Sequence, residues 1–128
     1  MPITITPIGK TSPTNPDAPM LYYPKATKTG EIDLEELSDQ IAYSSALTQS
    51  DCYAVIISLV ATVSRELDAG KIVRLGDLGA FQISVKGTGS NTPEAVSPKN
   101  VLSASVIFRS GKKFKTMLKG LRFVRKGK

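Results

Sequence analysis

The residues in this sequence best suited to a chemical role are its lysines and arginines, which concentrate in the second half of the chain. Residues 71–128 carry thirteen basic residues against two acidic ones, a net charge of +11, whereas residues 1–70 carry four against nine, a net charge of −5. Such a segregated field attracts polyanions, because each phosphate neutralised by Lys or Arg releases condensed counterions. We therefore expect a protein that binds nucleic acid, with a solvated basic face as the alternative.

Chemistry of other kinds has little support in the sequence. There is no histidine, the side chain most often used as a general base and metal ligand near neutral pH. Cys52 is the single cysteine, which excludes an intramolecular disulfide and a paired-cysteine metal or redox motif. Its apolar helical neighbours indicate a small buried hydrophobe rather than a nucleophile. We expect no enzyme, and no catalytic residue, metal, cofactor or small-molecule substrate.

Length and hydropathy indicate the number of domains and the cellular location to expect. A chain of 128 residues has the usual size of one compact domain that needs neither disulfides nor metal. No apolar run approaches the roughly 18 to 20 residues that span a bilayer, and the start lacks the pattern of a signal peptide. We therefore expect a cytoplasmic protein that makes no use of a membrane.

Helical patterns come first among the elements that must position the basic residues. Asp33 with Glu36 is typical of a capped helix start, and a second start signal follows at residues 48–51. Apolar residues then recur at three and four positions until Gly70, which is suited to a C-cap. This second helix is apolar on more than one side, and in a small chain the second contact is often a partner subunit.

After Gly70 the apolar period changes to two, which predicts strands. Residues 73–75 and 81–85 flank a turn at residues 76–79 and form a hairpin, and a third strand covers residues 102–108. Residues 87–100 between them are rich in turn formers and predict a loop or ribbon tip. Arg109, Ser110 and Gly111 then lead into a last helix whose core face includes Phe114 and Leu121.

The first residues of the chain predict an irregular arm. Six of the eight prolines fall in residues 1–24, which argues against a helix and against a central strand. The apolar alternation from Ile3 permits at most an edge strand at the start of this segment. Residues 21–24 offer an apolar anchor point.

Taken together, these segments resemble the HU/IHF family of bacterial histone-like proteins, in its branch with an N-terminal extension. The resemblance covers about residues 31–123. It rests on the pair of helices, on the hairpin segment from Lys71 to Phe81, and on the run from Val106 to Lys115. We therefore expect a Pro-rich extension over residues 1–31 and an HU-like DNA-binding domain over residues 32–128.

This resemblance implies an α+β fold with two N-terminal helices, a three-stranded antiparallel sheet with a short ribbon arm, and a C-terminal helix. It also implies an intertwined homodimer, or a heterodimer with a paralogue, that binds double-stranded DNA in the nucleoid and bends it by reading its shape. The segment between Phe81 and Phe108 departs from the family, because it is short and carries Lys86 and Lys99 as its basic residues, opposed by Glu94. Binding is therefore favoured over strong bending.

The residues expected to contact DNA lie on the strands, on the arm and at the start of the last helix. A helix start offers backbone amides and a positive dipole end to phosphate. Pro93 corresponds to the family's intercalating proline or, as we favour, stiffens a turn together with Pro98. The expected DNA-binding residues are Arg74, Lys86, Pro93, Lys99, Arg109, Ser110, Gly111, Lys112, Lys113, Lys115 and Lys119.

Two other functions stay open at this point. One is an HU-like dimeric scaffold that binds another protein, through residues 1–31, and binds DNA weakly or not at all. The other is RNA binding, which is disfavoured because aromatic residues make up 6% of the chain and no stacking pair is evident on the strands.

Overall fold

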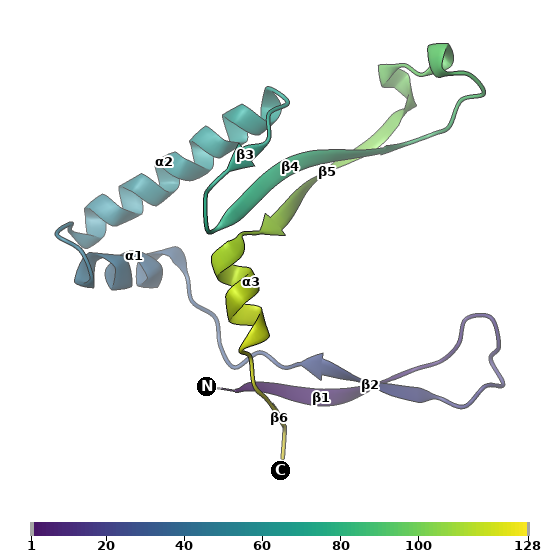
Figure 1. Ribbon diagram of the computed structural model, residues 1–128, viewed down its shortest axis with the longest axis horizontal. Coiled ribbons are helices and arrows are strands. Elements are labelled where there is room, and N and C mark those ends of the chain that lie inside the picture. The colour runs from purple at the N-terminus through teal and green to yellow at the C-terminus, as the bar shows by residue number, and fades with distance from the viewer. Residues whose placement is uncertain (1, 128) are drawn as a thin grey trace. The chain divides into compact units, whose positions relative to one another are not determined.

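A computed structural model describes residues 2–127, which fold into two compact units (Figure 1). The larger unit is Leu34–Met117, and the smaller one joins the residues up to Asp33 with those from Leu118 onward. The chain is α+β, as the sequence predicted, and the predicted order of two helices, three strands and a helix is confirmed within residues 34–119. A second sheet, which the sequence did not predict, is added to this plan.

Two helices, α1 (Leu34–Tyr43) and α2 (Gln49–Asp68), open the larger unit. The start at Thr48 is a capping box, in which the Asp51 amide donates to Thr48 Oγ1 at 3.1 Å. At the other end Gly70 adopts a φ of 83°, and the amides of Gly70 and Lys71 donate to the carbonyls of Leu67 and Glu66. This is a Schellman end, in which a glycine relieves the strain of a left-handed residue.

The larger unit contains the predicted antiparallel sheet, with strand order β3-β4-β5. Its strands are β3 (Val73–Arg74), β4 (Gly79–Gly87) and β5 (Val101–Ser110). Figure 1 shows β4 and β5 running together as a long ribbon away from the turn that joins β3 to β4. The ribbon therefore supplies both a sheet surface and a projecting arm.

The tip of the arm has more order than a plain loop. It contains two short 3-10 turns, η1 (Pro93–Ala95) and η2 (Pro98–Asn100), each begun by a proline. The Asn100 side chain ties the tip together: its amide donates to Thr88 Oγ1 at 3.0 Å, and its Oδ1 accepts from the Ser97 amide at 2.7 Å. One side chain thus joins the two ends of the connection.

The last helix, α3 (Lys112–Lys119), starts after Gly111 as predicted but ends before Leu121, which was expected within it. The chain then forms a further strand, β6 (Phe123–Arg125), that the sequence did not predict. Arg122 begins the connection to the first residues of the chain, because its carbonyl accepts from the Ile3 amide at 2.8 Å.

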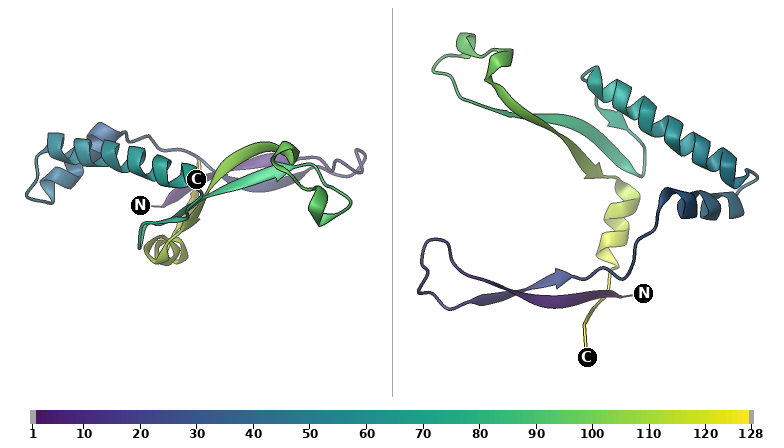
Figure 2. Two further views of the ribbon diagram at one scale, coloured as in Figure 1. Left: turned by 90° about the horizontal axis from the view of Figure 1, so that it is seen from above. Right: turned by 180° about the vertical axis from the view of Figure 1, so that it is seen from behind.

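The prediction of an irregular N-terminal arm is wrong. Residues 3–10 and 21–26 form strands β1 (Ile3–Lys10) and β2 (Leu21–Ala26), which pair antiparallel, while β1 and β6 pair in parallel. The sheet order is β2-β1-β6, so the first segment is the central strand rather than an edge. Figure 2 shows β1 and β2 twisting about each other as a ribbon.

The register explains how a proline-rich segment forms this sheet. The Thr27 amide donates to the Thr4 carbonyl at 2.7 Å, which fixes the alternation of the ladder and makes Pro7 and Pro24 a pair that is not hydrogen-bonded. The nitrogens of both prolines therefore point away from the partner strand. Pro7 faces a stretch beyond the end of β6, and Pro24 faces the free edge of β2, so neither proline removes a ladder hydrogen bond.

Very little apolar surface is buried within the single chain. Cys52, with 3% of its surface exposed, and Leu67, with 8%, are the buried apolar side chains among residues 2–127. The prediction that Cys52 is a buried hydrophobe is confirmed. Large side chains on α2 such as Val55 and Val60 remain about 60% exposed, which is unusual for a folded domain that acts alone.

No helix within residues 2–127 is long and apolar enough to cross a membrane. The same residues contain no group of three or more Cys, Asp or Glu side chains arranged to hold a metal ion.

Candidate nucleic-acid interface

The sheet of the larger unit has two chemically different faces. Because side chains alternate along a strand and paired residues share a face, the register sorts them without ambiguity. The apolar face carries Val73, Phe81, Ile83, Val85, Ala104, Val106 and Phe108. The polar face carries Arg74, Ala80, Gln82, Ser84, Lys86, Ser103, Ser105, Ile107 and Arg109.

Two arginines stand close together on the polar face. Arg74 on β3 pairs with Ala80 on β4, and Ala80 pairs in turn with Arg109 on β5. The three residues form one row across the sheet, with the small Ala80 methyl between the two long cationic side chains. Since neighbouring strands lie about 4.8 Å apart, the two arginines start about 10 Å from each other and leave space over Ala80 for an anion.

A hollow of about 330 Å³ opens at this row. It is lined by Arg74, Gly76, Gly79, Ala80, Arg109, Ser110, Gly111 and Lys115. We call it the basic hollow, because three of its lining side chains are cationic. The structure thus brings together five of the predicted contact residues, from β3, the end of β5, the junction at Gly111 and α3.

Two glycines make this assembly sterically feasible. A Cβ atom on Gly79 would lie 2.2 Å from the Arg109 carbonyl oxygen, and the φ of Gly79 is 140°. A Cβ atom on Gly111 would lie 2.3 Å from the Asp77 carbonyl oxygen. The turn between β3 and β4 can therefore rest directly against the end of β5 and the entrance to α3, which sets the positions of Arg109 and Lys115.

The entrance to α3 differs from the prediction in one detail. Gly111 was expected to present a free amide to phosphate, but its amide donates to the Leu78 carbonyl at 3.0 Å. This hydrogen bond holds the turn against the helix entrance. The amides of the first turn of α3 still lie at the positive end of the helix, where they lack partners in a preceding turn.

An aromatic cluster on the apolar face fixes the start of α3. The ring centroids of Phe81 and Phe108 lie 5.0 Å apart, and those of Phe108 and Phe114 lie 6.4 Å apart, both pairs tilted. Such tilted pairs stabilise by about 0.5–1.5 kcal/mol beyond the area they bury. They hold the first turns of α3 to the end of β5, which keeps Lys115 at the basic hollow.

The other predicted contact residues are spread more widely. Lys86 lies on the polar face six residues from Ala80 along β4, a separation of about 20 Å. Lys112 and Lys113 lie in the first turn of α3 without lining the hollow, whereas Pro93 and Lys99 lie at the arm tip and are exposed. Lys119, at the end of α3, belongs to the smaller unit.

The sequence did not predict a role for the uncharged polar residues that lie between the two cationic ends of this face. We call these residues the polar floor. Gln82 and Ser84 on β4 stand opposite Ile107 and Ser105 on β5, and Lys86 stands opposite Ser103. Hydroxyl and amide groups of this kind donate to phosphate oxygens without adding charge. The alternation of polar residues along the two strands was the available signal, but the pairing of the strands had to be known to use it.

Comparison with known families decides the relationship. The sequence model of the HU-HIG family, described as an HU domain fused to a wHTH, Ig or glycine-rich motif, matches residues 4–125. The chain belongs to the HU-HIG family. The match includes β1, β2 and β6, so the smaller unit is part of the HU-HIG pattern and not an addition to it. The resemblance to HU proteins stated from the sequence is confirmed.

Solved structures share the fold of this HU-HIG chain. A candidate bacterial DNA-binding protein from Bacteroides vulgatus superposes with a TM-score of 0.68 at 17% identity, covering 97% of this chain. The chain spans about half of that protein, 48% of its length. HU from Anabaena, in a cocrystal with DNA, superposes with a TM-score of 0.53 at 21% identity, covering 70% of this chain and 99% of HU. A comparison with curated protein sequences gave no significant match.

Proposed function

We propose that this chain is a non-catalytic, histone-like protein that binds duplex DNA through the polar face of β3, β4 and β5 and the entrance to α3. The observation that carries the proposal is the row of Arg74, Ala80 and Arg109, which Lys115 joins at the basic hollow. Three cations around one hollow suit a phosphate group, because Arg and Lys supply charge-assisted hydrogen bonds. A protein with the same fold, Anabaena HU, was crystallised with DNA.

The chemistry of this face favours binding that is largely independent of base sequence. Its contacts are charges and hydroxyl groups, which position a phosphate backbone but do not distinguish bases. None of the residues that make up the polar face is acidic, so a phosphate chain meets no repulsion along it. The face therefore suits any duplex, in keeping with a role in the nucleoid.

The same proposal includes a homodimer. A groove of about 400 Å³ runs beside α2, and its lining is almost wholly apolar: Leu59, Val60, Val63, Ser64, Leu67, Leu75, Leu78, Phe81 and Val106. We call it the α2 groove. Water-exposed apolar surface on this scale costs about 25 cal/mol per Å², and a second copy of the chain offers matching apolar surface on its own α2. The dimer would present two basic hollows to one duplex.

The arm supports binding more than strong bending. Lys86 on β4 and Lys99 at the tip are opposed by Glu94, and the arm exposes Val96 at its tip and Leu102 on β5. Wrapping an arm around DNA gains most of its energy from phosphate contacts, of which this arm offers few. We assign it a secondary part in the interface.

A salt series of duplex binding tests the proposal. The measurement is the dissociation constant of a labelled duplex for the wild type, for Arg74→Gln/Arg109→Gln, and for the control Arg65→Gln, which removes a cation from α2. We expect log affinity to fall linearly with log salt, by about 0.9 per phosphate contact, and the double variant to show a shallower slope. The control should keep the slope of the wild type.

Two results would contradict the proposal. Absence of duplex binding at about 50 mM salt would favour the protein-interaction scaffold. Tighter binding of single-stranded RNA than of duplex DNA in direct competition would favour the RNA-binding alternative.

A further inference from the structure

The smaller unit carries a net positive charge. The division of the sequence into residues 1–70 and 71–128 did not reveal it, because this unit takes residues from both. Within residues 2–33 and 118–127 there are seven basic residues against three acidic ones, because the basic C-terminal segment joins the N-terminal sheet. The acidic residues that made the first half of the chain negative lie mainly on α1 and α2, in the other unit. The net charge of +4 gives the smaller unit as a whole the sign that attracts a polyanion.

The two faces of this sheet follow from its register. Tyr22 pairs with Gly9 and stands on one face, whereas Tyr23 and Lys10 stand on the other, since Tyr23 pairs with Ile8 and Lys10 with Leu21. The Lys10 Nζ atom lies 5.7 Å from the centre of the Tyr23 ring, a cation–π contact. Tyr23 is 46% exposed, so part of its surface remains accessible to a ligand.

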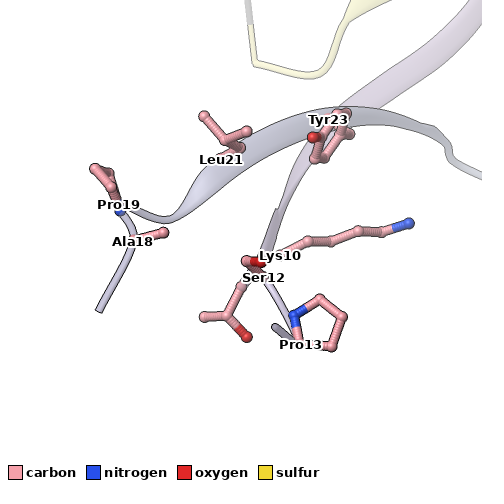
Figure 3. A pocket seen from close by; sticks show the side chains of 8 residues that line it. Lys10, Ser12, Pro13, Ala18, Pro19, Leu21 and Tyr23 are labelled. Carbon is pink, nitrogen blue, oxygen red and sulfur yellow. The ribbon is translucent and has the colours of Figure 1, made fainter. Parts of the chain in front are cut away.

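A pocket of about 480 Å³ opens at this contact, at the hairpin end of the sheet (Figure 3). Leu21 and Tyr23 stand on one side of it, Lys10, Ser12 and Pro13 on the other, and Ala18 and Pro19 close the end. Its volume falls within the roughly 300–1,000 Å³ of sites that hold small ligands. The pocket thus combines an aromatic ring, a lysine ammonium, hydroxyl groups and apolar walls.

We propose that this hairpin pocket binds an unpaired nucleotide of single-stranded DNA. The base stacks on the Tyr23 ring, and the Lys10 ammonium moves from the ring to the adjoining phosphate. The proposal rests on the proposed DNA-binding function for the identity of the polymer, but it uses none of the residues of the basic hollow.

Charge and chemistry favour a nucleic-acid strand over a peptide. A proline-rich peptide would use the aromatic ring and the apolar walls but would leave the Lys10 ammonium, the cation that lines the pocket, without an anionic partner. An unpaired nucleotide uses both, because aromatic stacking and backbone attraction are the two contributions to single-strand binding. Duplex DNA does not expose a base face to Tyr23, so the pocket differs in preference from the polar face of the larger unit.

A comparison of two strands of equal charge tests the stacking directly. The full-length chain is titrated against a labelled thymidine oligonucleotide and against an abasic strand of the same length, at low salt, with fluorescence anisotropy as the readout. Since base–aromatic stacking changes affinity by about 5- to 150-fold, the wild type should bind the thymidine strand at least about fivefold more tightly. Equal affinities for the two strands would overturn the proposal without recourse to any variant.

Variants then assign the preference to the pocket. Tyr23→Leu keeps an apolar residue on β2 and should abolish the preference for the base-containing strand, whereas Tyr23→Phe keeps the ring and should retain it. Tyr22→Leu, on the opposite face of the same strand, is the matched control and should also retain it. Lys10→Gln should weaken binding of both strands by a similar factor, because both carry phosphates.

The outcomes separate this proposal from the function proposed above. Arg74→Gln/Arg109→Gln should lose duplex affinity but keep the preference for the thymidine strand. A preference that persists without duplex binding would refute the duplex function alone. A preference that persists in Tyr23→Leu, or that disappears in Tyr22→Leu instead, would refute the hairpin pocket.

Discussion

Replacement of Gly79 by alanine is the sharpest single test of how the basic hollow is assembled. An added Cβ atom would lie 2.2 Å from the Arg109 carbonyl oxygen and 2.8 Å from the Phe108 ring. Atoms that close must move, and the nearest one belongs to the backbone of β5, which cannot turn aside as a flexible side chain can. The backbone of Gly79, with a φ of 140°, adds strain for any L-residue.

The two contributions set the size of the effect. Overpacking of this kind costs about 1–3 kcal/mol, and an L-residue held at a positive φ costs about 1–3 kcal/mol. We expect Gly79→Ala to lower the free energy of unfolding by about 2–6 kcal/mol, a large part of the stability of a small domain. Duplex affinity should fall as well, because Arg109 must shift.

Gly89→Ala is the matched control, because it lies in the same unit with no atom within 4 Å of the added Cβ and no positive φ. It should change stability by less than about 1 kcal/mol, in the stabilising direction if the unfolded chain loses freedom. Urea unfolding followed by circular dichroism measures both variants against the wild type. Equal stability of Gly79→Ala and Gly89→Ala would refute the close approach of turn and strand.

The α2 groove, the arm tip and the cap of α2 can each be tested by a single substitution. Val60→Glu, at a position 58% exposed in the single chain, should dissociate the proposed dimer, and a wild type that sediments as a monomer would remove that part of the proposal. Asn100→Ala should loosen the arm tip by removing the bonds to Thr88 and Ser97, seen as faster amide exchange there, with the β4–β5 ladder unchanged. Thr48→Ala should lower stability by about 1 kcal/mol through loss of the α2 cap, measured by thermal unfolding, and an unchanged midpoint would contradict the capping role.

Local patterns sufficed for most of the larger unit. The starts of α1 and α2, the end at Gly70 and the alternation on β4 and β5 each depend on residues a few positions apart. Such features are visible in the sequence because a cap or a turn is built from neighbours. The candidate site was predicted residue by residue in the same way, with Arg74, Arg109 and Lys115 assigned to three separate segments.

Arg74, Arg109 and Lys115 come together at one hollow only because segments that are distant in the sequence contact one another. Gly79 and Gly111 allow the turn, the strand and the helix to approach, and nothing in their local sequence indicates which backbone each would face. The Gly111 amide was expected to be free because its partner, the Leu78 carbonyl, lies far away in the sequence. Gln82, Ser84 and Ser105 likewise lie on one continuous polar surface only because β4 pairs with β5.

The sequence by itself determined the family, the order of the elements from Leu34 to Lys119 and the basic character of residues 71–128, because these depend on residue types and short periods. The tertiary structure decided the rest. Pro7 lies in a central strand because the register turns its nitrogen away from β2, and the end of β6 leaves that side unpaired. The pairing of β6 with β1 also changed the distribution of charge. It joined the basic C-terminal segment to strands from residues 1–70, which have a net negative charge in the sequence.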